Sequence, residues 1–301
     1  MNILSLNNVV KQYHNHRAVD DVSFDVRSQS IFGLLGPNGA GKTSLIRIIT
    51  TITAADRGEV MIDGKKLSQM SVRDIGYLPE ERGLYKKMKV GDQLMFLAQI
   101  KGLSKSDAKK NITYWFEKFE IQNWWNKKVD ELSKGMQQKI QFVSTVMHNP
   151  KLLILDEPFS GLDPINTNLI KDEIYRLNKE GTSIIFSTHR MEQVEEICED
   201  IVLMNNGKII LEGNVAQIKD DFKEHKYRIG FRGKLPATIS NENFKVIADH
   251  DDHVIIQGNQ GFSSNDLLRS LMSEGIQIES FSEIKPTLNE IFIKKVGDSN
   301  E

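Results

Sequence analysis

One stretch restricts the fold of this chain more than any other, the segment "SIFGLLGPNGAGKTSLIRIIT" from Ser30 to Thr50. It begins with a short apolar run that predicts a buried strand, and it ends with a run of helical character. Between them, "GPNGAGKT" matches the spacing G-x-x-x-x-G-K-[ST] of a phosphate-binding loop. Its glycines let backbone N–H groups surround phosphate oxygens, and the helix that follows directs its positive end at the same anion. The sequence therefore predicts a nucleotide site at the end of a buried strand.

The residue types in this loop assign specific tasks. We expect the ammonium group of Lys42 to reach the β- and γ-phosphates of ATP and the hydroxyl of Thr43 to bind Mg²⁺. The residues expected to line the nucleotide here are Gly36, Pro37, Asn38, Gly39, Ala40, Gly41, Lys42, Thr43 and Ser44.

A second segment, "LLILDEP", supplies carboxylates. Four apolar residues predict a buried strand that ends at Asp156 and Glu157, and ligands of parallel sheets bind at the carboxyl ends of strands. Asp156 would hold Mg²⁺ directly or through water. Glu157 points another way along the pleat, where it could polarise a water for attack on the γ-phosphate.

Strands alternate with helices over most of the chain, which favours a mostly parallel sheet covered on both faces. We expect a nucleotide-binding α/β domain over residues 1–222, with a helical insertion at about 89–150. In that insertion, Ile112, Trp115, Phe116 and Phe119 are spaced to pack on one face of a helix. Short strands and two helices after residue 222 predict a small separate α/β domain over residues 223–301.

Composition excludes several classes. With 39 Lys and Arg against 41 Asp and Glu, the net charge is −2, which gives no electrostatic footprint for nucleic acid. The one cysteine, Cys198, cannot form an internal disulfide and fits a reducing compartment. No apolar run approaches the roughly 18 residues of a spanning helix, and the N-terminus does not resemble a signal peptide.

The segment "ELSKGMQQKIQFVSTVMHNP" predicts a helix whose first turn binds an anion. Ser133 is a good N-cap, Lys134 follows it, and acidic residues are absent from the next turn. Because the phosphate-binding loop already surrounds one side of ATP, we expect Ser133 and Gly135 to cap the γ-phosphate of a nucleotide held by a second copy.

Together, "GPNGAGKT", "LSKGMQQ", "LLILDEP", "SGLD" (Ser160 to Asp163) and "STH" (ending at His189) resemble the ATP-binding subunits of ABC transporters over roughly residues 1–220. The resemblance implies the fold of a P-loop NTPase, and a head-to-tail dimer with two ATP molecules between the subunits. It also implies that Thr43 and Asp156 bind Mg²⁺, that Glu157 is the general base, that His189 senses the γ-phosphate and that Tyr13 stacks on adenine.

Two positions depart from the family pattern. Lys134 and Met136 replace a glycine and a glutamine of the usual signature, although Ser133 and Gly135 are kept. After "GYLP", Glu80 stands where the family has a glutamine that reaches Mg²⁺ and the attacking water, and a carboxylate can bind Mg²⁺ as well. The loop beyond it faces the membrane subunit in the family, so Glu81 and Arg82 are candidates for that contact.

The segments "YLPEERGLY" and "LSKGMQQK", with the C-terminal tail, are similar to a narrower group, the sodium- and drug-export type. We therefore expect the ATPase subunit of an exporter, a homodimer or a heterodimer with a similar ATPase, acting on an integral membrane permease. It would lie in the cytoplasm, peripheral on the inner face of the membrane, and bind no nucleic acid. The alternatives are a soluble ABC-type ATPase acting on nucleic acid or ribosomes, and a nucleotide-binding regulator without catalysis.

Overall fold

The computed structural model describes residues 1–81, 83–232, 244–259 and 263–298. The chain divides into two compact units, Met1–Asn214 and Val215–Glu301, and each is described by itself.

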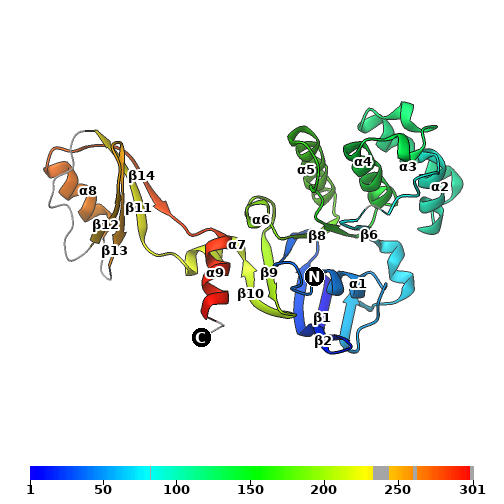
Figure 1. Cartoon of the computed structure of the whole chain (residues 1–301), viewed down its shortest axis with the longest axis horizontal. Helices are drawn as coiled ribbons and strands as arrows, with labels where there is room; N and C mark the ends of the chain where they lie inside the picture. Colours follow the sequence, from blue (N-terminus) through cyan, green and yellow to red (C-terminus); the bar gives the residue numbers. More distant parts are fainter. Residues whose placement is uncertain (82, 233–243, 260–262, 299–301) are drawn as a thin grey trace. The chain divides into compact units, whose positions relative to one another are not determined.

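The first unit contains a six-stranded sheet in the order β10-β9-β3-β8-β7-β6 (Figure 1). Its strands are β3 (Ile31–Leu35), β6 (Ile75–Leu78), β7 (Leu152–Asp156), β8 (Ser183–Thr188), β9 (Asp200–Asn205) and β10 (Lys208–Asn214). Five strands run parallel, and β10 returns antiparallel to β9 through a turn at Asn206 and Gly207, both with positive φ. Every residue of β3, β7 and β8 is buried, which explains their continuous apolar runs. The predicted, mostly parallel sheet is confirmed.

A second sheet in this unit is antiparallel, in the order β2-β1-β4-β5, and the sequence did not predict it. Its strands are β1 (Asn2–Tyr13), β2 (His16–Arg27), β4 (Arg57–Ile62) and β5 (Lys65–Lys66). The pairing of β1 with β2 shifts register several times, and Asn8 and Asp21 have positive φ. Such irregularities interrupt the strict alternation that identifies a half-buried strand.

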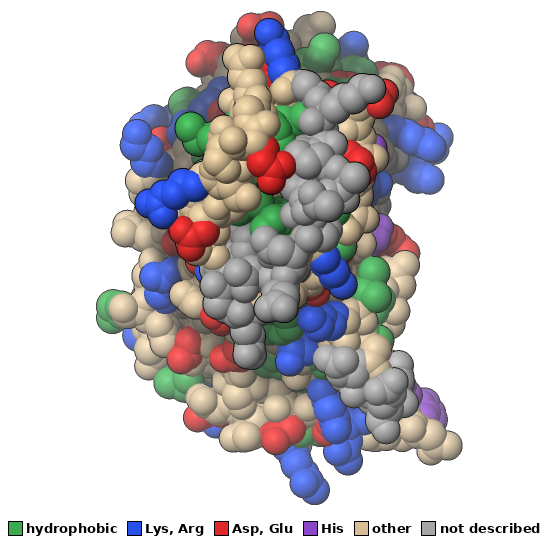
Figure 2. Space-filling model, turned by 90° about the vertical axis from the view of Figure 1, so that its left-hand side faces the viewer, with side chains coloured by type: hydrophobic (Ala, Val, Ile, Leu, Met, Phe, Trp, Pro, Cys, Tyr) green, Lys and Arg blue, Asp and Glu red, His purple; other side chains and the backbone are tan. Residues whose placement is uncertain are grey.

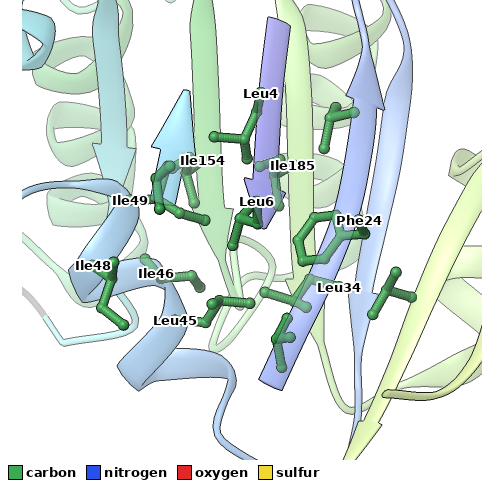
Figure 3. Packing of buried hydrophobic residues seen from close by; sticks show 14 of the residues in the cluster. Leu4, Leu6, Phe24, Leu34, Leu45, Ile46, Ile48, Ile49, Ile154 and Ile185 are labelled. Atoms are coloured by element: carbon green, nitrogen blue, oxygen red, sulfur yellow. The ribbon is translucent and has the colours of Figure 1, made fainter. Parts of the chain in front are cut away.

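The main hydrophobic core fills the space between the two sheets and helix α1 (Lys42–Ile49), as Figure 3 shows. Leu4, Leu6 and Phe24 come from the antiparallel sheet, whereas Leu34, Ile154 and Ile185 come from the parallel one; the helix adds Leu45, Ile46, Ile48 and Ile49. This packing holds the loop between β3 and α1 at both of its ends.

Helices α2 (Val90–Ile100), α3 (Lys105–Lys118) and α4 (Lys134–Val146) lie together near the β6 edge of the parallel sheet (Figure 1). Short 3₁₀ turns cover Gln69–Asp74, Gln122–Trp124 and Val129–Glu131. The aromatic face predicted for α3 is confirmed, since Ile112, Trp115, Phe116 and Phe119 are all buried and Trp115 meets Phe142 of α4 edge to face. Helices α5 (Pro164–Lys179) and α6 (Met191–Ile197) precede β8 and β9, respectively.

The second unit has its own antiparallel sheet, in the order β12-β13-β11-β14, and its own core. Its elements are α7 (Val215–Asp221), β11 (Lys226–Arg232), β12 (Phe244–Asp249), β13 (His253–Gly258), α8 (Ser264–Ser273), β14 (Gln277–Ile284) and α9 (Leu288–Asp298). All except α7 were predicted. Within the described residues, no helix combines the length and the apolar character needed to cross a membrane. Figure 2 shows both acidic and basic side chains on the face that it presents, in keeping with the near-balance of 39 basic and 41 acidic residues.

Candidate active site

The loop between β3 and α1 has the backbone that its glycines predict. Gly36, Gly39 and Gly41 all have positive φ. A Cβ atom at Gly36 would lie 2.3 Å from the carbonyl oxygen of Met204, so only glycine fits there. The ammonium group of Lys42 donates to the carbonyl oxygens of Gly36 at 2.6 Å and Pro37 at 3.1 Å. The loop therefore holds its own lysine close to the position expected for phosphate.

Asp156 is the last residue of β7 and is 4% exposed. The parallel register places it beside Ser187 of β8, whose hydroxyl donates to its Oδ1 at 2.8 Å. Burial raises the pKa of Asp156, the bond from Ser187 opposes that rise, and the charge of Glu80 adds to it. A cation at this carboxylate would relieve the cost of burying its charge.

Glu157 follows with φ of 50°, a conformation uncommon for residues other than glycine and often found at functional sites. Its Oε2 accepts from the hydroxyl of Thr188 at 3.0 Å. Its Oε1 accepts from the backbone N–H of His189 at 2.8 Å and lies 2.6 Å from the Nδ1 of the same histidine. Two predicted site residues, Glu157 and His189, are thus in direct contact.

Most of the predicted site residues line one cavity of about 210 Å³. Its lining residues are Tyr13, His16, Ala18, Asn38, Gly39, Ala40, Gly41, Lys42, Thr43, Ser44, Glu80, Asp156 and Glu157. Burial lowers the pKa of Lys42, while the carboxylates of Asp156, Glu157 and Glu80 oppose that change. Three carboxylates thus line the same cavity as one lysine, and a cation that entered with a nucleotide would offset their negative charge.

The donor set of this cavity fits Mg²⁺. The hydroxyl of Thr43 and the carboxylates of Asp156 and Glu80 are hard oxygen ligands of the kind that Mg²⁺ prefers. The described residues contain no group of three or more His, Cys, Asp or Glu that could hold a metal by itself.

Tyr13 ends β1, opposite His16 in the β1–β2 pairing, and its side chain is 37% exposed. The ammonium group of Lys11 lies 5.5 Å from the centre of its ring. The ring is available at the rim of the cavity, as adenine stacking would require. Sequence reasoning missed His16, Ser187 and Thr188; the hydroxyls immediately before His189 were the available signal for the last two.

Ser133 and Gly135 do not line this cavity. Ser133 caps α4 as predicted, accepting from the backbone N–H of Met136 at 3.3 Å, and the first turn holds no acidic residue. Ser133 and Lys134 are exposed. A Cβ atom at Gly135 would meet only the Nδ2 atom of Asn166 within 4 Å, at 3.9 Å, so its own chain does not require a glycine there.

Comparison with known proteins agrees with this geometry. The family model of ABC transporters matches residues 19–160, and the model of the ATP-binding protein DrrA1-3-like C-terminal domain matches residues 213–296. The ABC transporter ATP-binding protein YhaQ of Bacillus subtilis is 43% identical over 295 residues, which cover 98% of this chain and 99% of that protein.

The chain belongs to the ATP-binding proteins of ABC transporters. It is thus an ATPase subunit that couples ATP hydrolysis to transport, as the resemblance implied. The lipopolysaccharide export system ATP-binding protein LptB of Haemophilus influenzae is 33% identical over 241 residues, which cover 78% of this chain and 100% of LptB. A solved ATP-binding subunit of an ABC transporter superposes with a TM-score of 0.69 at 28% identity, covering 73% of this chain and 93% of that one.

In this ATPase subunit, the loop after β6 carries Glu80 and Glu81, both exposed. The side chain of Gln141 in α4 donates to the carbonyl oxygens on either side of Glu80, those of Pro79 at 3.0 Å and Glu81 at 3.3 Å. Arg82, which the sequence analysis paired with Glu81, lies outside the described residues.

Beside this loop is a mostly apolar cavity of about 310 Å³. Its lining includes Ile52, Leu84, Leu97, Ile100 and Lys101. The cavity therefore lies between the end of α1, helix α2 and the loop that carries Glu80.

Proposed function

We propose that this subunit closes head to tail on a second copy, so that the cavity of one chain and the N-terminus of α4 in the other enclose each ATP. One observation carries the proposal: the anion-binding first turn of α4 is exposed and lies outside the cavity that holds the other predicted nucleotide contacts. A helix N-terminus with a hydroxyl cap, a lysine and no acidic neighbour suits a phosphate group.

In the closed site, we assign the chemistry to this chain's own residues. Lys42 would leave the Gly36 and Pro37 carbonyls and bind the β- and γ-phosphates, while Tyr13 stacks on the adenine ring. Glu157 would orient a water for in-line attack on the γ-phosphorus, breaking the bond to the bridging oxygen and yielding ADP and phosphate. Mg²⁺ held by Thr43, Asp156 and Glu80 would supply charge stabilisation at the phosphates when bound.

His189 has a second task in this scheme. Because its Nδ1 lies on the carboxylate of Glu157, the far side of its ring is free to reach the γ-phosphate of the enclosed nucleotide. The same contact fixes the side chain of Glu157, so sensing of the phosphate and orientation of the base are joined in one hydrogen-bonded pair.

The partner is an integral membrane permease, which ATP-binding subunits of this family serve. We assign its docking site to the apolar cavity beside the Glu80 loop, where Glu81 and Arg82 would contact it. The subunit would then lie on the inner face of the membrane. Export as the direction of transport is supported by the similarity to LptB, an export-system protein by name, and by the matched DrrA1-3-like C-terminal domain.

The test uses Glu157→Gln, which keeps the shape of the side chain and removes the base. ATP should still bind, and the closed dimer should persist because hydrolysis no longer opens it. Size-exclusion chromatography with Mg-ATP should show a dimer for Glu157→Gln and a monomer when Ser133→Arg is added to the same chain. A Glu157→Gln protein that stays monomeric at high concentration with ATP contradicts the proposal.

A further inference from the structure

Two glutamines on the buried side of α4 are the starting point. Gln138 is 5% exposed and Gln141 is 3% exposed, and a spacing of three residues places them on the same side of the helix. A buried amide costs free energy unless it is hydrogen-bonded, so an interior glutamine usually has a specific partner.

Their partners are the loops that carry the two catalytic-site glutamates. Gln141 donates to the carbonyl oxygens of Pro79 and Glu81, which bracket Glu80. Gln138 donates to the carbonyl oxygen of Pro158 at 3.2 Å, and Pro158 directly follows Glu157. Both loops begin where a strand of the parallel sheet ends, beyond the regular ladder of β6 and β7.

The same helix begins at Ser133, whose first turn we assigned to the nucleotide of the partner. At 1.5 Å per residue, the side chain of Gln141 is only about 12 Å along the helix from that turn. Helix α4 has a continuous buried side, and if it shifted as one body, a displacement at Ser133 would reach both loops through these hydrogen bonds.

We propose that Gln138 and Gln141 are positioning residues that tie the placement of Glu157 and Glu80 at one nucleotide to the docking of the same helix on the other nucleotide. ATP bound in the partner would pull on α4, and the two amides would carry that displacement to the carboxylates of the chain's own site. The proposal rests on the shared sites described under the proposed function.

The experiment replaces Gln141 by methionine, which has a similar length and volume but cannot donate a hydrogen bond. The P-loop is untouched, so the KM for ATP should stay close to wild type, whereas kcat should fall about tenfold because Glu80 is no longer held. The Hill coefficient for ATP should fall towards one, which a purely structural role would not produce.

A double-mutant cycle locates the effect. If Gln141 acts through Glu80, Glu80→Ala combined with Gln141→Met should cost no more activity than Glu80→Ala alone. Losses that add, or a Gln141→Met protein with wild-type kcat and Hill coefficient, would overturn the proposal.

Asn111→Leu is the matched control. The Nδ2 atom of Asn111 donates to the carbonyl oxygen of Met147 at 2.8 Å. This change therefore also removes a hydrogen bond from a side-chain amide to α4, at the end of the helix remote from Ser133. It should lower the melting temperature as much as Gln141→Met does and leave kcat and the Hill coefficient unchanged. A kcat loss equal to that of Gln141→Met would show that loosening α4 anywhere suffices, which also overturns the proposal.

One further sample distinguishes a failure of the dimer model from a failure of the positioning role. The double variant Gln141→Met with Glu157→Gln should still dimerise with Mg-ATP. The two hydrogen bonds that Gln141 donates lie within its own chain and do not contribute to the dimer interface. If Glu157→Gln dimerises but the Gln141→Met single variant has wild-type kinetics, only the positioning role is rejected. If Glu157→Gln itself forms no dimer, the shared nucleotide site is rejected, and with it both the proposed function and this inference.

Discussion

The carboxyl edge of the parallel sheet and the N-terminus of α4 are the two regions that we propose bind phosphate, and they differ in what surrounds them. At the sheet edge, Lys42, Asp156 and Glu157 each have hydrogen-bond partners within their own chain. At the start of α4, Ser133 caps its own helix but is exposed, and Gly135 has open space beside it.

The difference shows which residues are restricted by the folding of their own chain. The sheet edge is constrained by folding, since changes there disturb the backbone and the core. At the first turn of α4, Ser133 has a local role as the helix cap, whereas the chain's own packing leaves room for a side chain at Gly135. In the proposed dimer, the nucleotide of a second subunit would occupy the space beside Gly135.

The largest expected effect is at Lys42. Lys42→Ala removes the positive side chain among three carboxylates, so ATP hydrolysis should fall by at least about 100-fold. Phosphate release by the purified variant measures this. Near-normal turnover would show that Lys42 does not bind the phosphates, and would contradict the assignment of the sheet edge as a phosphate site.

Two glycine substitutions sharpen the contrast between folding and function. Gly36→Ala would place a Cβ atom 2.3 Å from the Met204 carbonyl oxygen, so the free energy of unfolding should fall by about 3 kcal/mol. Gly135→Ala meets no obstacle and replaces a glycine within a helix, so its free energy of unfolding should stay the same or rise by up to about 1 kcal/mol, while hydrolysis falls about tenfold from crowding of the partner's phosphate. Urea unfolding and ATPase assays on both variants test this contrast. Equal losses of stability in the two variants would show that the two glycines do not differ in their importance for folding.

The smallest expected effect is a difference in pH response. Burial lowers the pKa of His148, just past the end of α4, to about 4, and the charge of Lys101 adds to that shift. Below an unfolded value of about 6.5, only the unfolded state takes up this proton, so the free energy of unfolding should fall by about 2 kcal/mol between pH 6.5 and pH 5. At the sheet edge the sign is opposite, because the raised pKa of Asp156 makes the folded state bind its proton first as the pH falls.

Urea unfolding at pH 7 and pH 5 checks this response, with His148→Gln as the control. The variant should lose less stability on acidification than the wild type. Equal losses in both proteins would show that His148 does not carry the effect.

A feature of this site could be predicted from the sequence when the residues that form it are close together in the chain. The loop from Gly36 to Ser44, the strands ending at Leu35 and Asp156, and the cap at Ser133 follow from residues adjacent in sequence. The hairpin of β1 and β2 escaped because positive φ at Asn8 and Asp21 and shifts of register interrupt the alternation.

Long-range contacts were beyond local reasoning. The bonds from Thr188 and His189 to Glu157 depend on how β8 aligns with β7. The bonds from Gln138 and Gln141 depend on how α4 packs against two loops. Two glutamines three residues apart, in a helix whose other buried residues are mostly apolar, were the visible sign of the second set.

The most direct test of the shared site is a cross-link between two differently marked chains. Asn38 and Ser133 are both exposed, and the native thiol of Cys198 is buried with its pKa raised by that burial, so only introduced cysteines should react. Asn38→Cys and Ser133→Cys are prepared separately in the Glu157→Gln background, mixed, and treated with a short bis-maleimide in the presence or absence of Mg-ATP. The account predicts a covalent dimer only in the mixture and only with ATP, whereas an ATP-dependent dimer by size exclusion that never cross-links in the mixture would contradict it.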